Sequence, residues 1–176
     1  MAFSFDGEFT VQRTPEETYD FLTDPNRFCP LLPDYEKVDV RGPEDFIVDV
    51  KVGISHIRGT ATVKLHLAEH NRPAKAYYTG KATMAGGNVD LNARFELRSE
   101  GNGTIVSWKG GAQVFGRLTS IAGGLLEPLA RKNVQKVINS LQQAMNAGVQ
   151  EQQSKPKVDQ SASLSVNPVA TDRLTD

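Results

Sequence analysis

The feature that most constrains this chain is a change in the spacing of its apolar residues near residue 116. Between Tyr35 and Val114, apolar residues alternate with polar ones in successive runs, a period typical of β-strands with one buried face. From Gly116 onward, apolar residues recur at spacings of three and four, which predicts one face of a long helix. A series of consecutive strands followed by one long helix indicates the α+β fold class, with a curved antiparallel sheet wrapped around the C-terminal helix.

The N-terminal segment predicts one further strand and a short helix. Residues 3–11 alternate between Phe, Gly or Val and polar side chains, as in a strand with one dry face. Thr14, Pro15 and Glu17 form a helix start, with a capping hydroxyl, a proline at the first helical position and the acid of a capping box. The helix is expected to end at Asp24, which precedes a proline and an apolar loop.

The apolar face of the final helix runs from Leu118 to Met145 and includes Leu125 and Leu129. Gly123, Gly124 and Pro128 interrupt this pattern, and because a helical proline lacks its backbone hydrogen bond, we expect either a kink in the helix or a new first turn at Pro128. After residue 148 the composition shifts to Gln, Ser, Lys and Asp with no repeated apolar face. The sequence therefore predicts one domain over residues 1–148 and a disordered polar tail over residues 149–176.

The inward rows of the predicted sheet contain many small residues, namely Gly59, Ala61, Ala76, Gly80, Ala82, Ala93 and Gly110. Small side chains on a concave face allow either close packing of the helix or a cavity beneath it, and the pattern alone favours neither. Gly110 and Gly111 are predicted to form a bulge or kink in the last strand, where the sheet bends.

Charge and composition argue against several classes of partner. The chain has 20 Lys and Arg residues and 21 Asp and Glu residues, so no broad positive field attracts nucleic acid or an anionic membrane. No stretch approaches the ~20 apolar residues that span a bilayer. The single cysteine excludes an intramolecular disulfide, and the first residues lack a signal-peptide core. A cytoplasmic location without a nucleic-acid partner is the expectation.

Motifs that carry chemistry are weak in this sequence. His66 and His70 fall on one predicted strand, where four positions separate them by ~13 Å, too far to share one metal ion. The apolar neighbours of Cys29 favour a buried or pocket-lining thiol over a nucleophile, and the glycine pairs form no phosphate-binding motif. We predict no catalytic residues, no metal site and no cofactor. The basic group Arg131, Lys132 and Lys136 is interpreted as a solvated helix face in preference to a partner-docking patch.

Several short segments, taken in order along the chain, resemble one protein family. They are residues 7–11 (GEFTV), 15–17 (PEE), 21–25 (FLTDP), 31–33 (LLP), 51–53 (KVG), 80–82 (GKA), 86–87 (GG), 103–108 (GTIVSW), 116–118 (GRL) and 123–127 (GGLLE). Their order and spacing are similar to those of the CoxG proteins associated with aerobic carbon monoxide dehydrogenases. This family lies within the START-like, or SRPBCC, superfamily of polyketide cyclases and lipid-transfer proteins. The resemblance covers about residues 3–146.

The resemblance implies a helix-grip fold of the START and Bet v type, with a hydrophobic tunnel between the sheet and the long helix. It also implies a non-catalytic carrier of a hydrophobic, lipid- or quinone-like small molecule. Such a carrier would act as an accessory subunit of a molybdenum-hydroxylase system, with peripheral membrane contact. The polar tail shows no membrane-attaching segment like that of some relatives. The alternative is a cyclase- or hydrolase-type enzyme that uses polar groups in the same cavity.

Eleven residues from the inward rows, the apolar loop and the final helix are predicted to line this cavity: Cys29, Leu32, Val50, Ala61, Tyr78, Ala82, Met84, Phe95, Trp108, Leu125 and Leu129. Tyr78 and Trp108 are core aromatics by default. Beside a cavity they become its wall, since their polar tips can hold an orienting hydrogen bond. A third hypothesis, compatible with ligand binding, is an accessory subunit that docks on its partner through the basic helix face or the loop over residues 28–33.

Overall fold

The computed structural model describes residues 1–153, with side-chain environments through residue 147. The elements, in chain order, are β1 (Ala2–Val11), α1 (Pro15–Leu22), α2 (Pro25–Phe28), the 3-10 turn η1 (Cys29–Leu31), β2 (Tyr35–Val40), β3 (Asp45–Ile54), β4 (Ile57–Asn71), β5 (Lys75–Met84), β6 (Gly87–Glu100), β7 (Gly103–Phe115) and α3 (Leu118–Gln153). All strands pair antiparallel in one sheet of order β1-β7-β6-β5-β4-β3-β2, so the first and last strands are neighbours. The predicted α+β class is confirmed.

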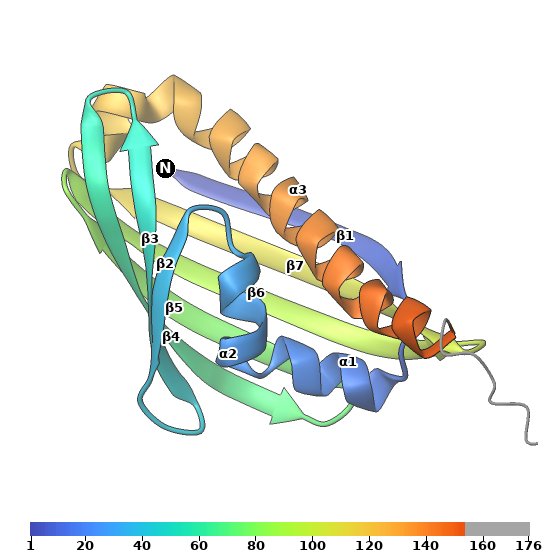
Figure 1. The fold of residues 1–176 in the computed structure, drawn as a ribbon. Helices are drawn as coiled ribbons and strands as arrows, with labels where there is room; N and C mark the ends of the chain where they lie inside the picture. Colours follow the sequence, from blue (N-terminus) through green and yellow to red (C-terminus); the bar gives the residue numbers. More distant parts are fainter. Residues whose placement is uncertain (154–176) are drawn as a thin grey trace, which may run out of the picture.

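The sheet is strongly curved, and α3 crosses its concave side (Figure 1). The short helices α1 and α2 lie on the same side, near the C-terminal end of α3. The strand register explains the dry concave face: Phe9 pairs with Val106, and Gly7 with Trp108, so the inward positions of β1 and β7 coincide. The alternation of apolar and polar residues along the strands makes the concave face apolar, and α3 packs on this face.

The first helix begins as its sequence predicts. The Thr14 hydroxyl accepts a hydrogen bond from the Glu17 backbone N–H (3.2 Å), and the Glu17 carboxylate accepts one from the Thr14 N–H (3.1 Å). Pro15 occupies the first helical position, where no backbone N–H is needed. This reciprocal cap fixes the direction in which α1 leaves β1.

Hydrogen bonds hold α3 at both of its ends. At the N-terminal end, the Leu118 N–H donates to the Gly86 carbonyl in the β5–β6 turn (2.9 Å). Near residues 142–146 three bonds join the helix to the β1–α1 connection: Gln12 N–H to Asn146 Oδ1 (2.9 Å), Arg13 Nε to the Met145 carbonyl (2.6 Å) and Gln142 Nε2 to the Thr10 carbonyl (3.1 Å). Within the described residues, no helix has the length and apolar character needed to cross a membrane.

The alternative of a new first turn at Pro128 is wrong, because α3 continues as one helix through Gly123, Gly124 and Pro128. A proline removes one backbone hydrogen bond, and the buried side chains of Leu118, Ala122 and Leu126 hold the turns before it against the sheet. The helix runs to Gln153, past the expected boundary at residue 148. Residues 154–176, which make up most of the predicted disordered tail, lie outside the described residues.

The predicted bulge at Gly110 and Gly111 is also wrong. Gly110 pairs with Ala93, and Gly111 with Asn92, in an unbroken β6–β7 register. The register shifts of the sheet lie elsewhere, between Tyr35 and Lys37 in β2 and between Leu67 and Glu69 in β4. Gly110 therefore leaves this part of the concave face without a side chain and does not interrupt the strand pairing.

Candidate functional site

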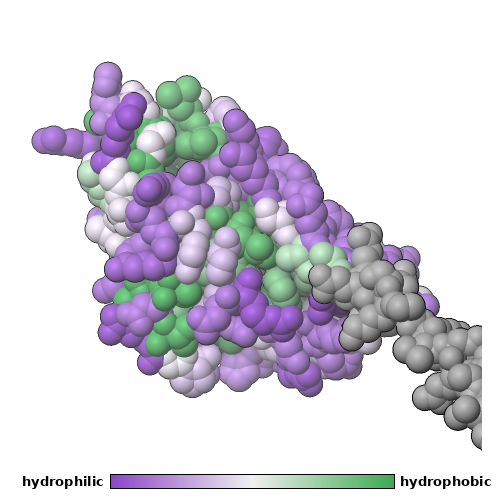
Figure 2. Space-filling model, viewed as in Figure 1, coloured by the Kyte–Doolittle hydropathy of each residue, from purple (hydrophilic) through white to green (hydrophobic). Residues whose placement is uncertain are grey.

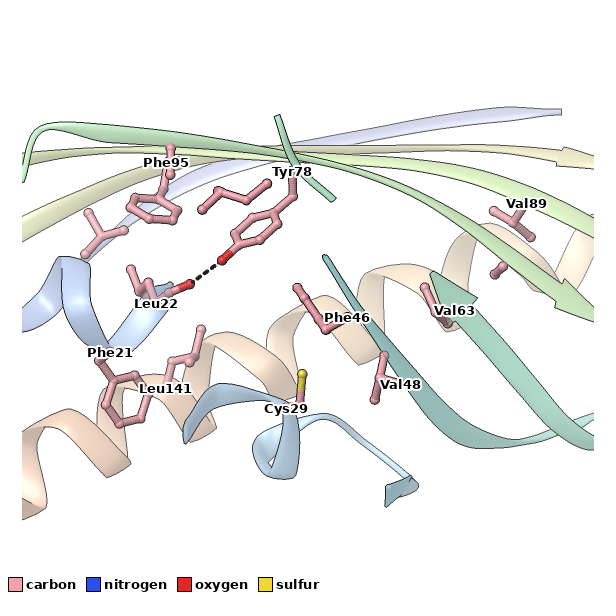
Figure 3. Close-up of a cluster of buried hydrophobic side chains, with 14 of the residues drawn as sticks. Phe21, Leu22, Cys29, Phe46, Val48, Val63, Tyr78, Val89, Phe95 and Leu141 are labelled. Atoms are coloured by element: carbon pink, nitrogen blue, oxygen red, sulfur yellow. Dashed lines mark hydrogen bonds between the residues drawn. The ribbon is translucent and has the colours of Figure 1, made fainter. Parts of the chain in front are cut away.

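One end of the concave face is closed by three aromatic side chains that we call the aromatic cluster: Phe28, Phe46 and Tyr78. Figure 3 shows Phe46 and Tyr78 among the buried side chains around them. Their ring centroids lie 5.7 Å (Phe28 to Phe46), 6.0 Å (Phe46 to Tyr78) and 6.1 Å (Phe28 to Tyr78) apart, in edge-on or tilted geometry. The Tyr78 hydroxyl donates a hydrogen bond to the Leu22 carbonyl at the end of α1 (3.0 Å). This bond satisfies a buried polar group and joins α1 to the sheet.

Two adjoining cavities lie between the rest of the concave face and α3. The apolar cavity has a volume of about 540 Å³ and reaches Leu22, Phe95 and Leu141. The rim cavity has a volume of about 380 Å³ and reaches Lys51 and Lys132 at the molecular surface. They share the walls Pro33, Val50, Val63, Leu91, Ala112, Ala130 and Asn133, so they form one continuous hollow. Each volume lies within the roughly 300–1,000 Å³ that is usual for small-molecule sites.

The hollow is the consequence of small residues at facing positions on neighbouring strands. Ala93 on β6 pairs with Gly110 on β7, and Leu91 pairs with Ala112. Ala93 points to the concave side and remains exposed, since no side chain of residues 1–147 covers it. Figure 2 shows apolar surface at the centre of this face, between α3 and the segment that joins α2 to β2, with polar surface on either side. The concave face is therefore open as well as apolar.

Two uncharged polar side chains, Asn133 and Trp108, line the inner part of this hollow. Asn133 on α3 lines both cavities, and Trp108 on β7 lines the apolar cavity. The Trp108 indole lies over Gly7, where a Cβ atom would come within 3.1 Å of the ring. Seven side chains in the described part of α3 take part in hydrogen bonds, and Asn133 is not among them: Thr119, Glu127, Arg131, Gln135, Asn139, Gln142 and Asn146. The Asn133 amide is therefore free to bond a ligand.

The two ionisable side chains among the eleven predicted lining residues lie outside the hollow. Cys29 is fully buried in η1, and burial, with a smaller contribution from the charge of Asp24, raises the pKa of its thiol to about 12. A thiol with this pKa is protonated at neutral pH and is a poor nucleophile. Burial likewise raises the pKa of Tyr78, whose hydroxyl is engaged with Leu22.

The histidines on β4 bind separate carboxylates on the exposed surface. His66 Nδ1 lies 2.9 Å from Asp45 Oδ1, and His70 Nε2 lies 3.1 Å from Glu44 Oε1. Among residues 1–153, no group of three or more His, Cys, Asp or Glu side chains is placed to hold a metal ion.

Eight of the eleven predicted lining residues line the hollow, with Leu32, Phe95 and Trp108 in the apolar cavity, Ala61, Ala82, Met84 and Leu129 in the rim cavity, and Val50 in both. The other three do not line it: Cys29 and Tyr78 are buried, and Leu125 is 57% exposed on α3. Leu126 faces the sheet instead, because the buried stripe of α3 runs through Leu118, Ala122 and Leu126.

A larger groove of about 1,000 Å³ runs between the start of β1 and the outer side of α3. Its α3 side consists largely of exposed polar and charged side chains: Glu127, Arg131, Gln135, Asn139, and Lys132 and Lys136, which also line the rim cavity. Such a wall is suited to water and does not enclose an apolar molecule. The hollow under α3 is therefore the better candidate site.

The fold is shared with proteins whose structures are solved. A conserved protein from Geobacillus kaustophilus matches with a TM-score of 0.72 and 17% identity over 81% of this chain and 95% of that chain. A START superfamily protein from Mycobacterium smegmatis matches with a TM-score of 0.62 and 11% identity over 81% and 96%. The Zhui aromatase/cyclase from Streptomyces sp. R1128 matches with a TM-score of 0.60 and 16% identity over 80% and 92%. These likenesses show the START-like helix-grip fold.

Sequence comparison identifies the family. No curated protein matches the chain significantly in sequence. The family model described as the CoxG subunit of carbon monoxide dehydrogenase matches residues 7–146, which include every strand from β2 to β7 and the part of α3 that covers the hollow. The chain therefore belongs to the CoxG family.

Proposed function

We propose that this protein binds and carries a hydrophobic small molecule in the hollow between the sheet and α3. The observation that carries the proposal is the open apolar surface around Ala93, Gly110 and Ala112, which no side chain in the described part of the chain fills. Atoms that line an unfilled space lack van der Waals partners on one side. A ligand of matching shape supplies those contacts and removes apolar surface from water.

The polar groups of the hollow support a carrier in preference to a cyclase or hydrolase. Asn133 and Trp108 can donate hydrogen bonds to a ligand, but neither side chain exchanges protons near neutral pH. Four charged side chains line the rim cavity and not the apolar cavity: Asp34, Lys51, Lys132 and Lys136. Cys29 and Tyr78, which have ionisable groups, are buried outside the hollow. The cavity volumes suit a lipid- or quinone-like molecule.

Displacement of an environment-sensitive apolar dye from the full chain tests this proposal, together with native mass spectrometry of the purified protein. The Ala93→Phe variant fills the apolar cavity and should reduce dye binding at least tenfold. Ala68→Phe, an exposed position on β4 that lines neither cavity, is the matched control and should bind normally. Equal binding by the two variants, or no binding by the natural chain, would overturn the proposal.

The family supports a more specific role as an accessory subunit. CoxG proteins are described as a subunit of carbon monoxide dehydrogenase, so the partner we propose is a molybdenum hydroxylase of that type, with peripheral membrane contact in the cytoplasm. Affinity capture of a purified dehydrogenase by the full chain, followed by fractionation with membranes, tests both. If the immobilised chain does not bind the dehydrogenase, the proposed subunit role is wrong, and the proposed carrier role is unaffected.

A further inference from the structure

Four charged side chains line the rim cavity, and three of them are positive. Lys132 and Lys136 lie one turn apart on α3, and Lys51 lies on β3. Asp34, just before β2, is the single acid among the lining residues. The mouth of an otherwise apolar hollow therefore carries an excess of positive charge, although the whole chain is close to neutral.

These lysines differ from the other cations near α3 and the sheet edge. Arg131 pairs with Glu127 (3.1 Å), and Lys37 pairs with Asp49 (3.5 Å). Lys51, Lys132 and Lys136 take part in none of the ion pairs of the described residues. Like charges one helical turn apart repel each other, so Lys132 and Lys136 do not stabilise α3 through their charge. An anion between them and Lys51 would relieve this repulsion.

The hollow provides a continuous path inward from the lysines. Val50, Ala112 and Asn133 belong to both cavities, and beyond them the apolar cavity extends to Phe95 and Leu141. A charged group buried at the inner end would lose its hydration without a charged partner. A charged group at the rim keeps contact with water and gains charge-assisted hydrogen bonds from lysine ammonium groups.

We infer that the natural ligand is an amphiphile with a long apolar chain and an anionic headgroup, a carboxylate or a phosphate monoester. Its chain occupies the apolar cavity, and its headgroup lies at the rim among Lys51, Lys132 and Lys136. This inference rests on the proposed carrier function and names the class of molecule carried. The flexible lysine stems can lie along apolar rim residues while their ammonium groups reach the headgroup.

Calorimetry with the full chain tests the inference with three ligands that share one chain length: hexadecanoate, hexadecyl phosphate and hexadecan-1-ol, below their aggregation limits. We expect at least one anion to bind roughly tenfold more tightly than the alcohol, because charge-assisted hydrogen bonds are stronger than neutral ones. This preference should shrink as salt screens the lysines. The two anions distinguish a fatty acid from a phosphorylated lipid.

The double variant Lys132→Gln/Lys136→Gln should lose most of the preference for the anions and retain its affinity for the alcohol. The matched control is Lys64→Gln/Lys81→Gln, which removes two exposed lysines paired across β4 and β5 on the convex face. It should preserve the preference.

Equal affinity for the anions and the alcohol, or a lysine pair whose removal changes nothing, would overturn the headgroup inference and leave the carrier function intact. The headgroup inference also fails if a neutral isoprenoid quinone binds more tightly than both anions, or if inorganic phosphate alone displaces hexadecyl phosphate at comparable concentration. A chain that binds none of these amphiphiles would overturn the inference and the proposed function together.

Discussion

The two ends of the concave face are built from the same strands, but one end is packed and the other is hollow. Tyr78 and Ala82 lie four residues apart on the same face of β5. Tyr78 belongs to the aromatic cluster and bonds α1, whereas Ala82 lines the rim cavity. Side-chain volume alone therefore divides one sheet into an end that stabilises the fold and an end that leaves space for a ligand.

The long helix shows the same division along its length. Leu141 and Met145 are buried, and the segment around them is hydrogen-bonded to the β1–α1 connection. The middle of the helix, around Ala130 and Asn133, spans the hollow. Because α3 is held near both ends, a ligand can occupy the space beneath its middle without displacing the contacts that anchor it.

The largest expected loss of stability comes from a substitution in the packed end. Phe46 is 3% exposed and packs edge-on against Phe28 and Tyr78, so Phe46→Ala should lower the free energy of unfolding by about 3–5 kcal/mol. Urea denaturation followed by fluorescence measures this loss. A cost below about 1 kcal/mol would show that the aromatic cluster does not stabilise the fold, and the contrast between the two ends would fail.

A second experiment places the same substitution at both ends. Ala76 is 2% exposed and pairs with Phe95 on β6, so Ala76→Phe should overpack this region and destabilise the protein by about 1–3 kcal/mol. Ala93 faces the open hollow, and Ala93→Phe should change stability by less than about 1 kcal/mol.

The two variants should show the opposite order in ligand binding. Ala93→Phe occupies the apolar cavity and should weaken binding of an apolar dye, whereas Ala76 lines neither cavity. Thermal denaturation and dye titration of both proteins measure the two quantities. Similar destabilisation at both positions would mean that the hollow closes in solution.

The sequence predicted the strands and the first helix because these elements depend on local rules. The alternation of apolar and polar residues places Phe9 on the buried face of β1. The capping residues Thr14 and Glu17 start α1 through contacts within four residues, which do not depend on the rest of the fold. The continuity of α3 depends on packing that is distant in sequence. Ala122 and Leu126 meet the sheet, and this contact outweighs the loss of one hydrogen bond at Pro128.

The candidate site was predicted in outline for the same reason. Alternation identifies which residues face the helix, so Val50, Ala61 and Trp108 were placed correctly on the concave side. It does not show whether a large inward side chain closes the space, as Tyr78 does, or leaves it open. Asn133 was missed, although a polar residue four positions from both Leu129 and Val137 on an apolar stripe is a signal that sequence analysis can use.

A smaller loss of stability should follow from removing the Tyr78 hydroxyl, which tests whether the packed end stabilises the fold without binding the ligand. Tyr78→Phe keeps the ring in the aromatic cluster but leaves the buried Leu22 carbonyl without its donor, at a cost of about 1–2 kcal/mol. Because Tyr78 does not line either cavity, ligand affinity should stay within about twofold of its original value, a change of under 0.5 kcal/mol. A large loss of ligand affinity at unchanged stability would place the hydroxyl in the binding site and weaken the division.

The smallest expected effect is a pH dependence of stability that arises from Cys29 in the packed end. Burial raises the pKa of Cys29 from 9.0 to about 12, so the folded protein holds this proton more tightly than the unfolded chain does. The resulting stabilisation is fully present below pH 9 and is lost as the pH rises, because the unfolded thiol ionises first. The loss should reach about 1 kcal/mol between pH 9 and pH 10.

Denaturation at pH 8, 9 and 10 measures how the free energy of unfolding falls with pH. The Cys29→Ala variant has no thiol, so its free energy of unfolding should fall by about 1 kcal/mol less between pH 9 and pH 10. Burial also raises the pKa of Tyr78, so this residue adds its own pH dependence of stability above pH 10, the ordinary pKa of tyrosine. The comparison therefore stops at pH 10. Ligand affinity over this pH range should be the same for the natural chain and for Cys29→Ala, since the thiol lines neither cavity. Equal slopes for the natural chain and the variant would mean that water reaches Cys29, and the packed end would then be looser than its buried side chains indicate.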